Sequence, residues 1–383
     1  MSTFSNAFDG ALGIVVSGGP APGLNSAIAS ITIEGLNRGL KVYGFRRGFE
    51  GIISHGSECA LKLDYKDVSQ INGDGGSIIG TSRCNPLKTQ NSKNAFVSTL
   101  EKLEIDKLVV IGGEGSAYVS YSISQEFPAL KIVHLPKTID NDLCLPGYYP
   151  SFGYETARYA GETILRTLIT DAITTERWFV ITTMGRKAGF LALGAGLSAG
   201  STLTLIPEEF EQNSITHEDI AEIILHSIQT RLKAGKNYGT AILAEGILEK
   251  FDFSRIPELK DCPRDDMGRI QYTELELEDL VTAALRRKLV KAGLNIRIVK
   301  KNIGYELRCH DPVSFDIEYT KFLGYGAVNY LLKGASACMI VRDDDQIGAI
   351  PLASMLDANG SIRSRTVDLK SDLYKVARSF MIR

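Results

Sequence analysis

Short apolar runs that end in glycine-rich turns and lead into helical patterns constrain the fold of this chain most strongly. Residues 12–17 (LGIVVS) precede such a turn and a helical pattern over about 24–38, and residues 107–111 (KLVVI) precede another turn and a helical pattern near 116–126. Strands that alternate with crossover helices predict a parallel, doubly wound sheet. Because ligands of such sheets bind beyond the carboxyl ends of the strands, we expect the glycine turns to lie at a binding site.

The same alternation continues along a chain that is too long for one hydrophobic core. Its 383 residues exceed the usual size of a single domain, which is about 100–200 residues. We therefore predict an α/β fold of two Rossmann-like, doubly wound domains with an active-site cleft between them. Further strands are predicted at 40–45, 131–135, 177–184, 202–206 and 239–244, and further helices at about 153–172 and 319–332.

Composition and charge argue against several classes of protein. The net charge is −2, with 44% hydrophobic and 23% charged residues, which is typical of a globular protein without a nucleic-acid or membrane-surface partner. The six cysteines form no CxxC pair, so they indicate reduced thiols rather than a disulfide framework or a zinc site. There is neither a secretory signal nor a run of about 20 apolar residues that could span a bilayer. We expect a soluble cytoplasmic protein.

The first glycine turn, residues 17–25 (SGGPAPGLN), has the position and composition of a phosphate-binding loop. Glycines such as Gly18 and Gly19 let backbone N–H groups approach a phosphate, and the following helix adds a favourable dipole. The spacing matches neither the GxGxxG dinucleotide fingerprint nor the GxxxxGK[ST] P-loop. A tight strand-to-helix turn without a ligand therefore stays open for this loop alone.

The second glycine turn, residues 111–116 (IGGEGS), also follows a strand and precedes a helix. Two such loops on one sheet make a polyphosphate cradle the better interpretation. Glu114 could hold a Mg²⁺ ion that bridges phosphate oxygens, since this cation prefers oxygen ligands. The alternative is a solvated acid that stabilises the first turn of the helix.

A third segment, residues 136–142 (PKTIDND), places a lysine and two carboxylates at the end of the next predicted strand. Phosphoryl transfer needs a base for the attacking hydroxyl and cations that neutralise charge on the transferred group. Asp140 could be that base, with Thr138 positioning the phosphoryl group. Asp142 could help to hold the metal, and Lys137 could face the phosphates. An Asn-Asp turn with a helix cap is the alternative.

These motifs, taken in order, resemble those of the phosphofructokinases over most of the chain. The resemblance implies two α/β domains, Mg²⁺-dependent transfer of a phosphoryl group to the 1-hydroxyl of fructose 6-phosphate to give fructose 1,6-bisphosphate, and a homo-oligomer, dimeric or tetrameric, with active sites shared between subunits. The matching segments are SGGPAPGLN, GTSRCNP (80–86), GGEGS, PKTIDND, ERWFVITTMGR (176–186), PEE (207–209), AEG (244–246) and GYELR (304–308).

The resemblance also implies roles for single residues on the sugar-phosphate side. Asp140 looks like the base, and Lys137 and Arg186 look like the catalytic cations beside it. Arg177 is similar to the basic residue that one subunit donates to its neighbour's site. The implied sugar-phosphate ligands are Thr138, Asp140, Arg177, Met184, Gly185, Arg186, Glu245, Tyr305 and Arg308, with Tyr305 and Arg308 gripping the 6-phosphate.

On the donor side, the resemblance implies that Arg83 contacts the transferred phosphates and that Glu114 and Asp142 hold the Mg²⁺. The implied donor domain spans residues 1–151 plus about 307–360, and the sugar-phosphate domain spans 152–306 plus about 361–383. The implied donor-binding residues are Gly18, Gly19, Arg83, Cys84, Gly113, Glu114, Gly115 and Ser116.

The phosphoryl donor is ATP in some phosphofructokinases and pyrophosphate in others. Pyrophosphate users usually carry a second acid where this chain has Gly115, and a carboxylate there would repel the α-phosphate of a nucleotide. Lys137 is typical of the pyrophosphate branch, although some ATP users have it too. That branch or its mixed relatives is also resembled by three segments, GGPAPG (18–23), MGRKAGFLALG (184–194) and GYELRCHDPVSFDIEYTKFLGYGA (304–327). We expect ATP as the donor on the Gly115 argument, with a reversible pyrophosphate-dependent enzyme as the alternative.

Two other classes of function stay open. A catalytically weak regulatory subunit that partners an active paralogue would have no chemical need for Asp140, Asp142, Arg186, Glu245 and Arg308 together. A plain nucleotide- or sugar-binding module would not need a base beside a metal-binding acid. An enzyme is therefore the favoured interpretation.

Overall fold

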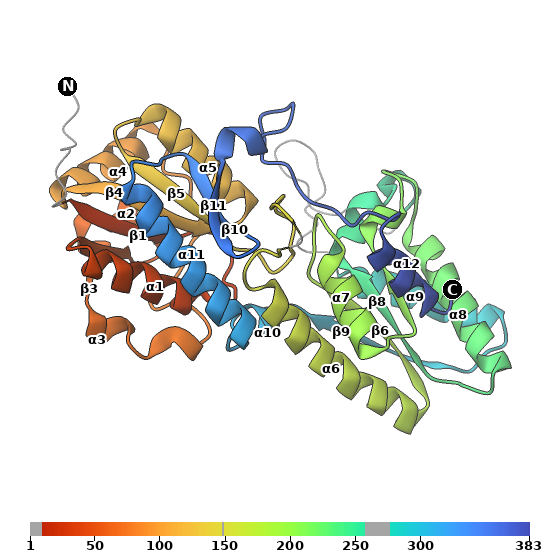
Figure 1. The fold of residues 1–383 in the computed structure, drawn as a ribbon. Helices are drawn as coiled ribbons and strands as arrows, with labels where there is room; N and C mark the ends of the chain where they lie inside the picture. The colour runs from red at the N-terminus through yellow and green to blue at the C-terminus, as the bar shows by residue number, and fades with distance from the viewer. Residues whose placement is uncertain (1–9, 148, 257–275) are drawn as a thin grey trace. The chain divides into compact units, whose positions relative to one another are not determined.

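Two β-sheets, one in each of two units of the chain, organise the computed structural model (Figure 1). The structure describes residues 10–147, 149–256 and 276–383. The first unit comprises Met1–Ala157 and Glu306–Arg365, and the second comprises Arg158–Tyr305 and Thr366–Arg383. No helix in the described ranges is long and apolar enough to cross a membrane.

The sheet of the first unit has seven strands in the order β11-β10-β5-β4-β1-β2-β3. Its five central strands are parallel, as predicted, but β3 and β11 pair antiparallel with their neighbours at the two edges. The hairpin between β10 and β11 turns at Asp344, whose φ is 50°. Hairpin turns of this kind usually carry an Asn-Gly or Asp-Gly pair, which explains why this one was not recognised in the sequence. The strands are β1 (Ala11–Val16), β2 (Lys41–Phe45), β3 (Ala60–Leu63), β4 (Ile105–Gly112), β5 (Lys131–Pro136), β10 (Cys338–Asp343) and β11 (Gln346–Pro351).

Helices cover both faces of this sheet because its central strands are apolar on both sides. Along β1, Leu12 and Ile14 pack into the core under α1 and α11, whereas Val15 packs into the core under α2, α4 and α5. Side chains that point alternately to the two faces require such a two-sided cover. The helices of this unit are α1 (Leu24–Asn37), α2 (Gly48–His55), α3 (Tyr65–Val68), α4 (Gln90–Lys102), α5 (Glu114–Glu126) and α11 (Ser314–Leu332), and the short helix α10 (Tyr305–Arg308) begins at the unit boundary.

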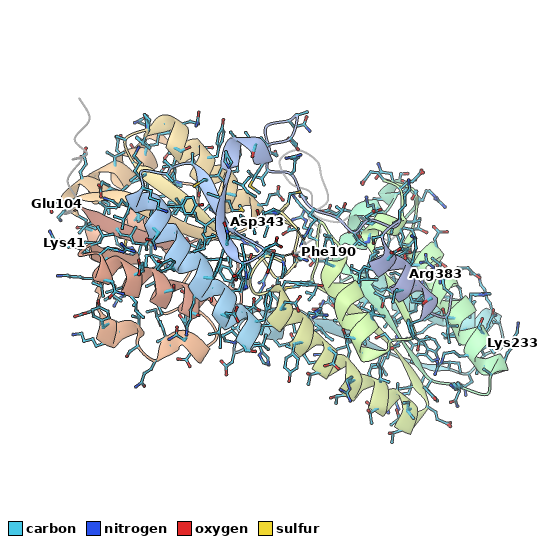
Figure 2. The ribbon with its side chains drawn as sticks, in the orientation of Figure 1. Lys41, Glu104, Phe190, Lys233, Asp343 and Arg383 are labelled. Carbon is cyan, nitrogen blue, oxygen red and sulfur yellow. The ribbon has the colours of Figure 1, made fainter. Side chains whose placement is uncertain are left out.

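The strand order places the first two glycine turns side by side. From β1 the chain proceeds through β2 to β3 on one side, and it then returns to add β4 and β5 on the other side of β1. The point where the direction reverses, between β1 and β4, is where ligands bind in open α/β sheets. At the opposite edge of the sheet, Lys41 and Glu104 form only an exposed ion pair (Nζ–Oε2 3.2 Å; Figure 2).

The second unit contains a smaller, fully parallel sheet in the order β7-β8-β6-β9. Helices α8 and α9 bury one face of it, and α7 packs on the other face, where Gly196 approaches Thr204 and Ile242. Strand β9 was not predicted because Lys300, Lys301 and Asn302 interrupt its apolar pattern, which an edge strand tolerates. The elements are β6 (Arg177–Thr183), β7 (Leu203–Leu205), β8 (Gly239–Ala244), β9 (Arg297–Ile303), α7 (Phe190–Ala199), α8 (His217–Lys233), α9 (Leu277–Lys291) and α12 (Asp372–Ser379), and α6 (Tyr154–Thr175) begins in the first unit and continues into the second.

Candidate functional site

In the turn after β1, two glycines leave the main chain open to the side chains of a lysine and an arginine. Gly18 has φ +88°, a conformation that L side chains rarely adopt. A Cβ atom on Gly18 would lie 3.3 Å from Lys137 Nζ, and one on Gly19 would lie 3.4 Å from Arg308 Cζ. Glycine at both positions therefore lets a lysine and an arginine approach the main chain of the first loop.

Lys137 is the most unusual titratable group of this region. Only 3% of it is exposed, and its ammonium donates a hydrogen bond to the carbonyl of Gly19. Burial first, and then the positive charges of Arg308 and Arg83, lower the pKa of Lys137 to about 7. This site favours a bound anion, because an anion would offset the electrostatic repulsion between the buried ammonium and the two guanidinium groups.

A buried chain of hydrogen bonds lies beneath both glycine loops. Ser116 Oγ donates to Ser17 Oγ over 2.9 Å, which ties the start of α5 to the end of β1. Burial lowers the pKa of His134 to about 4, so the ring is neutral. Its Nε2–H donates to the Gly112 carbonyl at 2.9 Å, which leaves Nδ1 to accept from Ser120 Oγ at 3.0 Å. This chain fixes the main chain from which the second loop departs.

The turn that carries Asp140 is held by its own polar groups. The Asp140 N–H donates to Thr138 Oγ1 (3.1 Å), and Ser151 Oγ donates to the Thr138 carbonyl (2.8 Å). Asn141 has φ 58° and is buried, and its Oδ1 accepts from the Ser151 N–H at 3.1 Å. The next helix, α6, begins only at Tyr154, so this turn is not a helix cap. Asp140 itself is half-buried.

The two predicted metal ligands, Glu114 and Asp142, are contacted by one short segment from the C-terminal part of the first unit. Ser364 Oγ donates to Glu114 Oε2 at 3.1 Å, and the Arg365 N–H donates to the Asp142 carbonyl at 2.7 Å. No three Asp, Glu, His or Cys side chains of the described ranges form a group that could hold a metal by themselves. Mg²⁺ is usually bound by one or two carboxylates together with substrate phosphates, and this pair fits that requirement.

The other predicted donor residues lie around these loops. Glu114 is the first residue of α5, after Gly113, and Gly115 faces open space, since no heavy atom would lie within 4 Å of a Cβ there. Arg83 is exposed. Cys84 is half-buried, and burial followed by the charge of Glu50 raises the pKa of its thiol.

In the second unit, three predicted segments follow the ends of three neighbouring strands. Met184–Arg186 follows β6, Glu245 follows β8 and Tyr305 follows β9, and Thr183 lies in register with both Ala244 and Ile303. The Gly246 N–H donates to the Gly185 carbonyl (3.1 Å), and the Met184 N–H donates to the Ile303 carbonyl (3.3 Å). The fold thus brings these residues together at one edge of the smaller sheet.

Two glutamates accept hydrogen bonds from the loop that follows β6. Arg186 Nε donates to Glu249 Oε1 at 2.7 Å, and 54% of the arginine side chain is exposed. Both carboxylate oxygens of Glu208 accept from the Gly189 N–H, at 3.0 and 3.2 Å, where the loop enters α7. No role for the PEE segment (207–209) followed from the sequence, and this contact supplies one.

Tyr305 and Arg308 share helix α10 but fall on the two sides of the unit boundary. Tyr305 is 78% exposed at the end of the second unit's segment. Arg308 belongs to the first unit, where its guanidinium lies against Gly19. The structure therefore places Arg308 beside the first glycine turn, residues 17–25.

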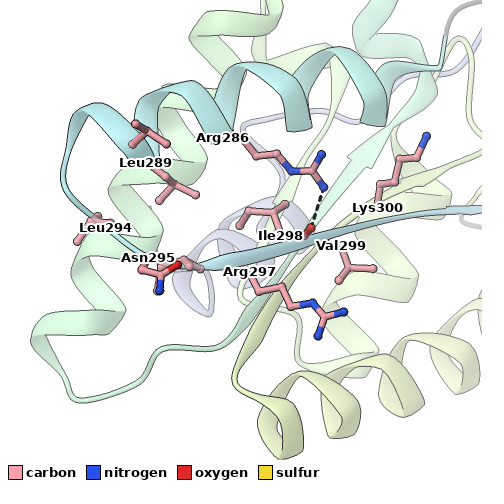
Figure 3. Close-up of a pocket in the computed structure, with 10 residues that line it drawn as sticks. Arg286, Leu289, Leu294, Asn295, Arg297, Ile298, Val299 and Lys300 are labelled. Carbon is pink, nitrogen blue, oxygen red and sulfur yellow. Dashed lines mark hydrogen bonds between the residues drawn. The ribbon is translucent and has the colours of Figure 1, made fainter.

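Arg177 lies at the opposite edge of the second sheet from Met184, because it is the first residue of β6. It is half-buried, with Nε 3.9 Å from Asp171 Oδ1. A cavity of about 650 Å³ lies beside α9 and β9, and its lining includes Arg297, the register partner of Arg177 (Figure 3). The Arg286 guanidinium donates to the Ile298 carbonyl within it (3.0 Å). None of the predicted site residues lines this cavity.

The chain is similar to phosphofructokinases along most of its length. The sequence matches the family model described as Phosphofructokinase over residues 11–331. It is 41% identical to the pyrophosphate–fructose 6-phosphate 1-phosphotransferase of Thermotoga maritima, over 97% of this chain and 90% of that protein. Identity to the Naegleria fowleri protein of the same name is 42%, over 97% and 88%.

More distant matches extend the comparison. The ATP-dependent 6-phosphofructokinase of Thermotoga neapolitana is 31% identical, over 96% of this chain and 98% of that protein. A crystal structure of Pichia pastoris phosphofructokinase in the T-state superposes with a TM-score of 0.71 at 27% identity. The match covers 90% of this chain and only 35% of that longer chain.

Proposed function

The chain belongs to the phosphofructokinase family, and we propose that it transfers a phosphoryl group from pyrophosphate to the 1-hydroxyl of fructose 6-phosphate. The observation that carries the choice of donor is the buried ammonium of Lys137, which lies against Gly19 with the charges of Arg308 and Arg83 acting on it. A small, highly charged anion neutralises such a cluster best. The products would be fructose 1,6-bisphosphate and orthophosphate, the leaving group of the transfer.

The expectation of ATP from Gly115 is not supported by the comparisons. The relatives that share 41% and 42% identity bear the name of pyrophosphate enzymes, whereas the ATP-dependent relative shares 31%. The open space around Gly115 leaves room for an α-phosphate, but it does not require one. The alternative of a pyrophosphate-dependent enzyme is therefore the better proposal.

The first unit would bind the donor and supply the base. The start of α5, with Gly113 before it and Ser116 in its first turn, offers backbone N–H groups to phosphate oxygens. Asp140 would take the proton of the attacking 1-hydroxyl, and Thr138 would contact the transferred group. Glu114 and Asp142 would hold a Mg²⁺ ion together with the donor, and the ion would neutralise charge on the phosphates.

The second unit would bind the sugar phosphate. Met184, Gly185 and Arg186 would form its loop, Glu245 would accept hydrogen bonds from sugar hydroxyls, and Tyr305 would contact the 6-phosphate. Arg308, which the resemblance predicts as a second 6-phosphate ligand, lies in the first unit against Gly19, where its guanidinium would bind the donor; its planar fork can donate two hydrogen bonds to a phosphate at once.

Arg177 supports a homo-oligomer with shared sites. It lies at the edge of its own sheet that is remote from Met184, so it would serve the site of a neighbouring subunit. Oligomer size and a cytoplasmic location stay predictions. The retained base, cations and carboxylates favour an active enzyme over a regulatory subunit.

The donor proposal predicts that pyrophosphate supports turnover at least about a hundredfold better than ATP, a difference in transition-state stabilisation of about 2.7 kcal/mol. The measurement is formation of fructose 1,6-bisphosphate from fructose 6-phosphate and Mg²⁺, with each donor in parallel. Gly115→Asp serves as the paired variant, since the open space there admits the side chain without a clash. It should leave pyrophosphate kinetics unchanged and lower any residual use of ATP. Turnover with ATP alone would overturn the proposal.

The ion pair between Arg186 and Glu249 predicts a competition with substrate. Glu249→Gln should lower KM for fructose 6-phosphate by up to about fivefold, because exposed ion pairs contribute about 0.2–1 kcal/mol. The value of kcat should stay unchanged. Glu222→Gln is the matched control, because Glu222 of α8 forms an exposed ion pair with Lys288 of α9 (2.7 Å). Equal KM values for the Glu249 and Glu222 variants would show that this pair does not restrain Arg186.

A further inference from the structure

The last residues of the first unit, Ser364 and Arg365, contact the loops to which the proposed function assigns the base and the metal ligands. The base turn, residues 137–142, carries Asp140. Leu143 directly follows it and forms an antiparallel bridge with Ser364. The Ser364 hydroxyl donates to Glu114 (3.1 Å), and the Arg365 N–H donates to the Asp142 carbonyl (2.7 Å). From the sequence, this segment was expected to lie in the sugar-phosphate domain (152–306 plus about 361–383), and no role was expected for Ser364 or Arg365.

Arg365 grips the central residue of the base turn at two oxygens. Its Nε donates to the main-chain carbonyl of Asn141 (3.2 Å), and a terminal nitrogen donates to Asn141 Oδ1. The Ser151 N–H donates to the same Oδ1. A guanidinium suits this task because its donors are fixed in one plane, whereas a lysine ammonium is a single point.

Asn141 needs such support because of its conformation and its neighbours. Its φ of 58° lies in the left-handed region, which costs a non-glycine residue free energy, although asparagine tolerates it better than most. It stands between Asp140 and Asp142, so its backbone sets the direction of both carboxylates. Strand β5 ends at Pro136, and the bridges beyond it join Lys137 to Phe152 and Leu143 to Ser364, so they flank Asn141 without including it.

We propose that Arg365 is a positioning residue for phosphoryl transfer, which fixes Asn141 and thereby aims Asp140 at the attacking hydroxyl. Ser364 would act in the same way on Glu114. This inference rests on the proposed role of Asp140 as the base. A base must lie within hydrogen-bond reach of the proton that it removes, so a small shift of the turn would slow the chemical step and leave the binding of either substrate largely intact.

The test compares kcat and KM in variants of two nearby arginines. Arg365→Met should lower kcat by about 10–100-fold, the usual effect of removing a partner that orients a functional group. KM for fructose 6-phosphate should change less than twofold. Because a smaller folded fraction would also lower the apparent kcat at constant KM, the folded fraction of each variant is measured by circular dichroism and kcat is expressed per folded enzyme. Arg365→Lys should fall between the Met variant and the unmodified enzyme. Arg363→Met is the matched control, because Arg363 is exposed and donates to the Ser354 carbonyl (2.7 Å); it should behave like the unmodified enzyme.

A double-mutant cycle with Asn141→Gly keeps the test valid even if Arg365→Met folds poorly. Glycine adopts the left-handed conformation freely but removes the Oδ1 that Arg365 grips. Arg365→Lys should therefore cost less kcat in the Asn141→Gly background than in the unmodified enzyme. Equal costs in both backgrounds, or Arg365 variants with the kcat of the Arg363 control, would overturn this inference. Full turnover by Asp140→Asn would instead overturn the proposed function, so the two failures are distinguishable.

Discussion

Asp140→Asn is expected to lower kcat for transfer to fructose 6-phosphate by about 10²–10⁴-fold, the range that general-base catalysis contributes. Asparagine has nearly the same shape but cannot accept the proton of the 1-hydroxyl. The turn should keep its structure, because asparagine is nearly isosteric with aspartate and the substitution leaves in place the main-chain N–H that donates to Thr138 Oγ1. Steady-state kinetics with pyrophosphate, together with calorimetric binding of fructose 6-phosphate, separates loss of chemistry from loss of binding.

The control for this variant is Asp345→Asn, which changes an exposed aspartate in the β10–β11 hairpin of the same unit. It should leave kcat and the unfolding midpoint unchanged. If Asp140→Asn retained near-normal turnover, Asp140 would have no part in the mechanism. If it lost fructose 6-phosphate binding as well, its role would be in holding the sugar rather than in proton transfer.

Lys137→Met should lower kcat/KM for pyrophosphate by about 10²–10³-fold, the usual loss when one preorganised donor to a developing anion is removed. Methionine keeps the length of the side chain and removes its charge. Lys131→Met is the matched control, since Lys131 begins the strand that Lys137 follows, at the opposite edge of the sheet. If kcat/KM for pyrophosphate fell equally in both variants, the loss would come from a disturbed strand β5 rather than from the missing ammonium of Lys137.

The lowered pKa of Lys137 also gives this prediction a pH dependence. In the free enzyme the ammonium loses its proton above pH about 7, so kcat/KM for pyrophosphate should fall as the pH rises through that value. The Met variant should lack this descending limb. A pH profile of both proteins between pH 6 and about 9 tests it, since steps in kcat/KM report groups of the free enzyme.

Protein stability should change with pH in the opposite direction. The ordinary pKa of the lysine is 10.5, and the folded value is about 7, so between these values the unfolded chain binds more protons than the folded one. Stability contributed by this group therefore rises with pH across that window. Urea unfolding of the unmodified enzyme and of Lys137→Met should show a smaller stability difference at pH 9.5 than at pH 7.

Much of the site could be predicted because its residues sit in short local patterns. The glycine turn after β1, the GGEGS turn and the PKTIDND turn each follow an apolar strand, and the carboxyl end of a parallel strand is where ligands bind. Position along the chain therefore indicated function before any contact was known. The same patterns predicted the strands β1, β2, β4, β5, β6, β7 and β8.

Elements with weak local signals were missed. Strand β9 carries exposed lysines because it lies at a sheet edge, and the hairpin of β10 and β11 lacks the usual turn residues. The phosphoryl donor could not be inferred from one short motif either, since Gly115 by itself is compatible with ATP and with pyrophosphate. The identities of 41% and 42% to pyrophosphate enzymes extend over nearly the whole chain and carry more weight than one position.

The sequence by itself determined the alternation of strands and helices, the glycine turns and the acidic and basic residues of the site, because each depends on neighbours a few positions away. Only the tertiary structure decided that the turns after β1 and β4 are adjacent and that Lys137 is buried against Gly19. It also decided that Arg365 holds Asn141 from 224 positions away in the chain. Burial, a lowered pKa and a long-range hydrogen bond arise from packing between distant segments, and no local pattern encodes them.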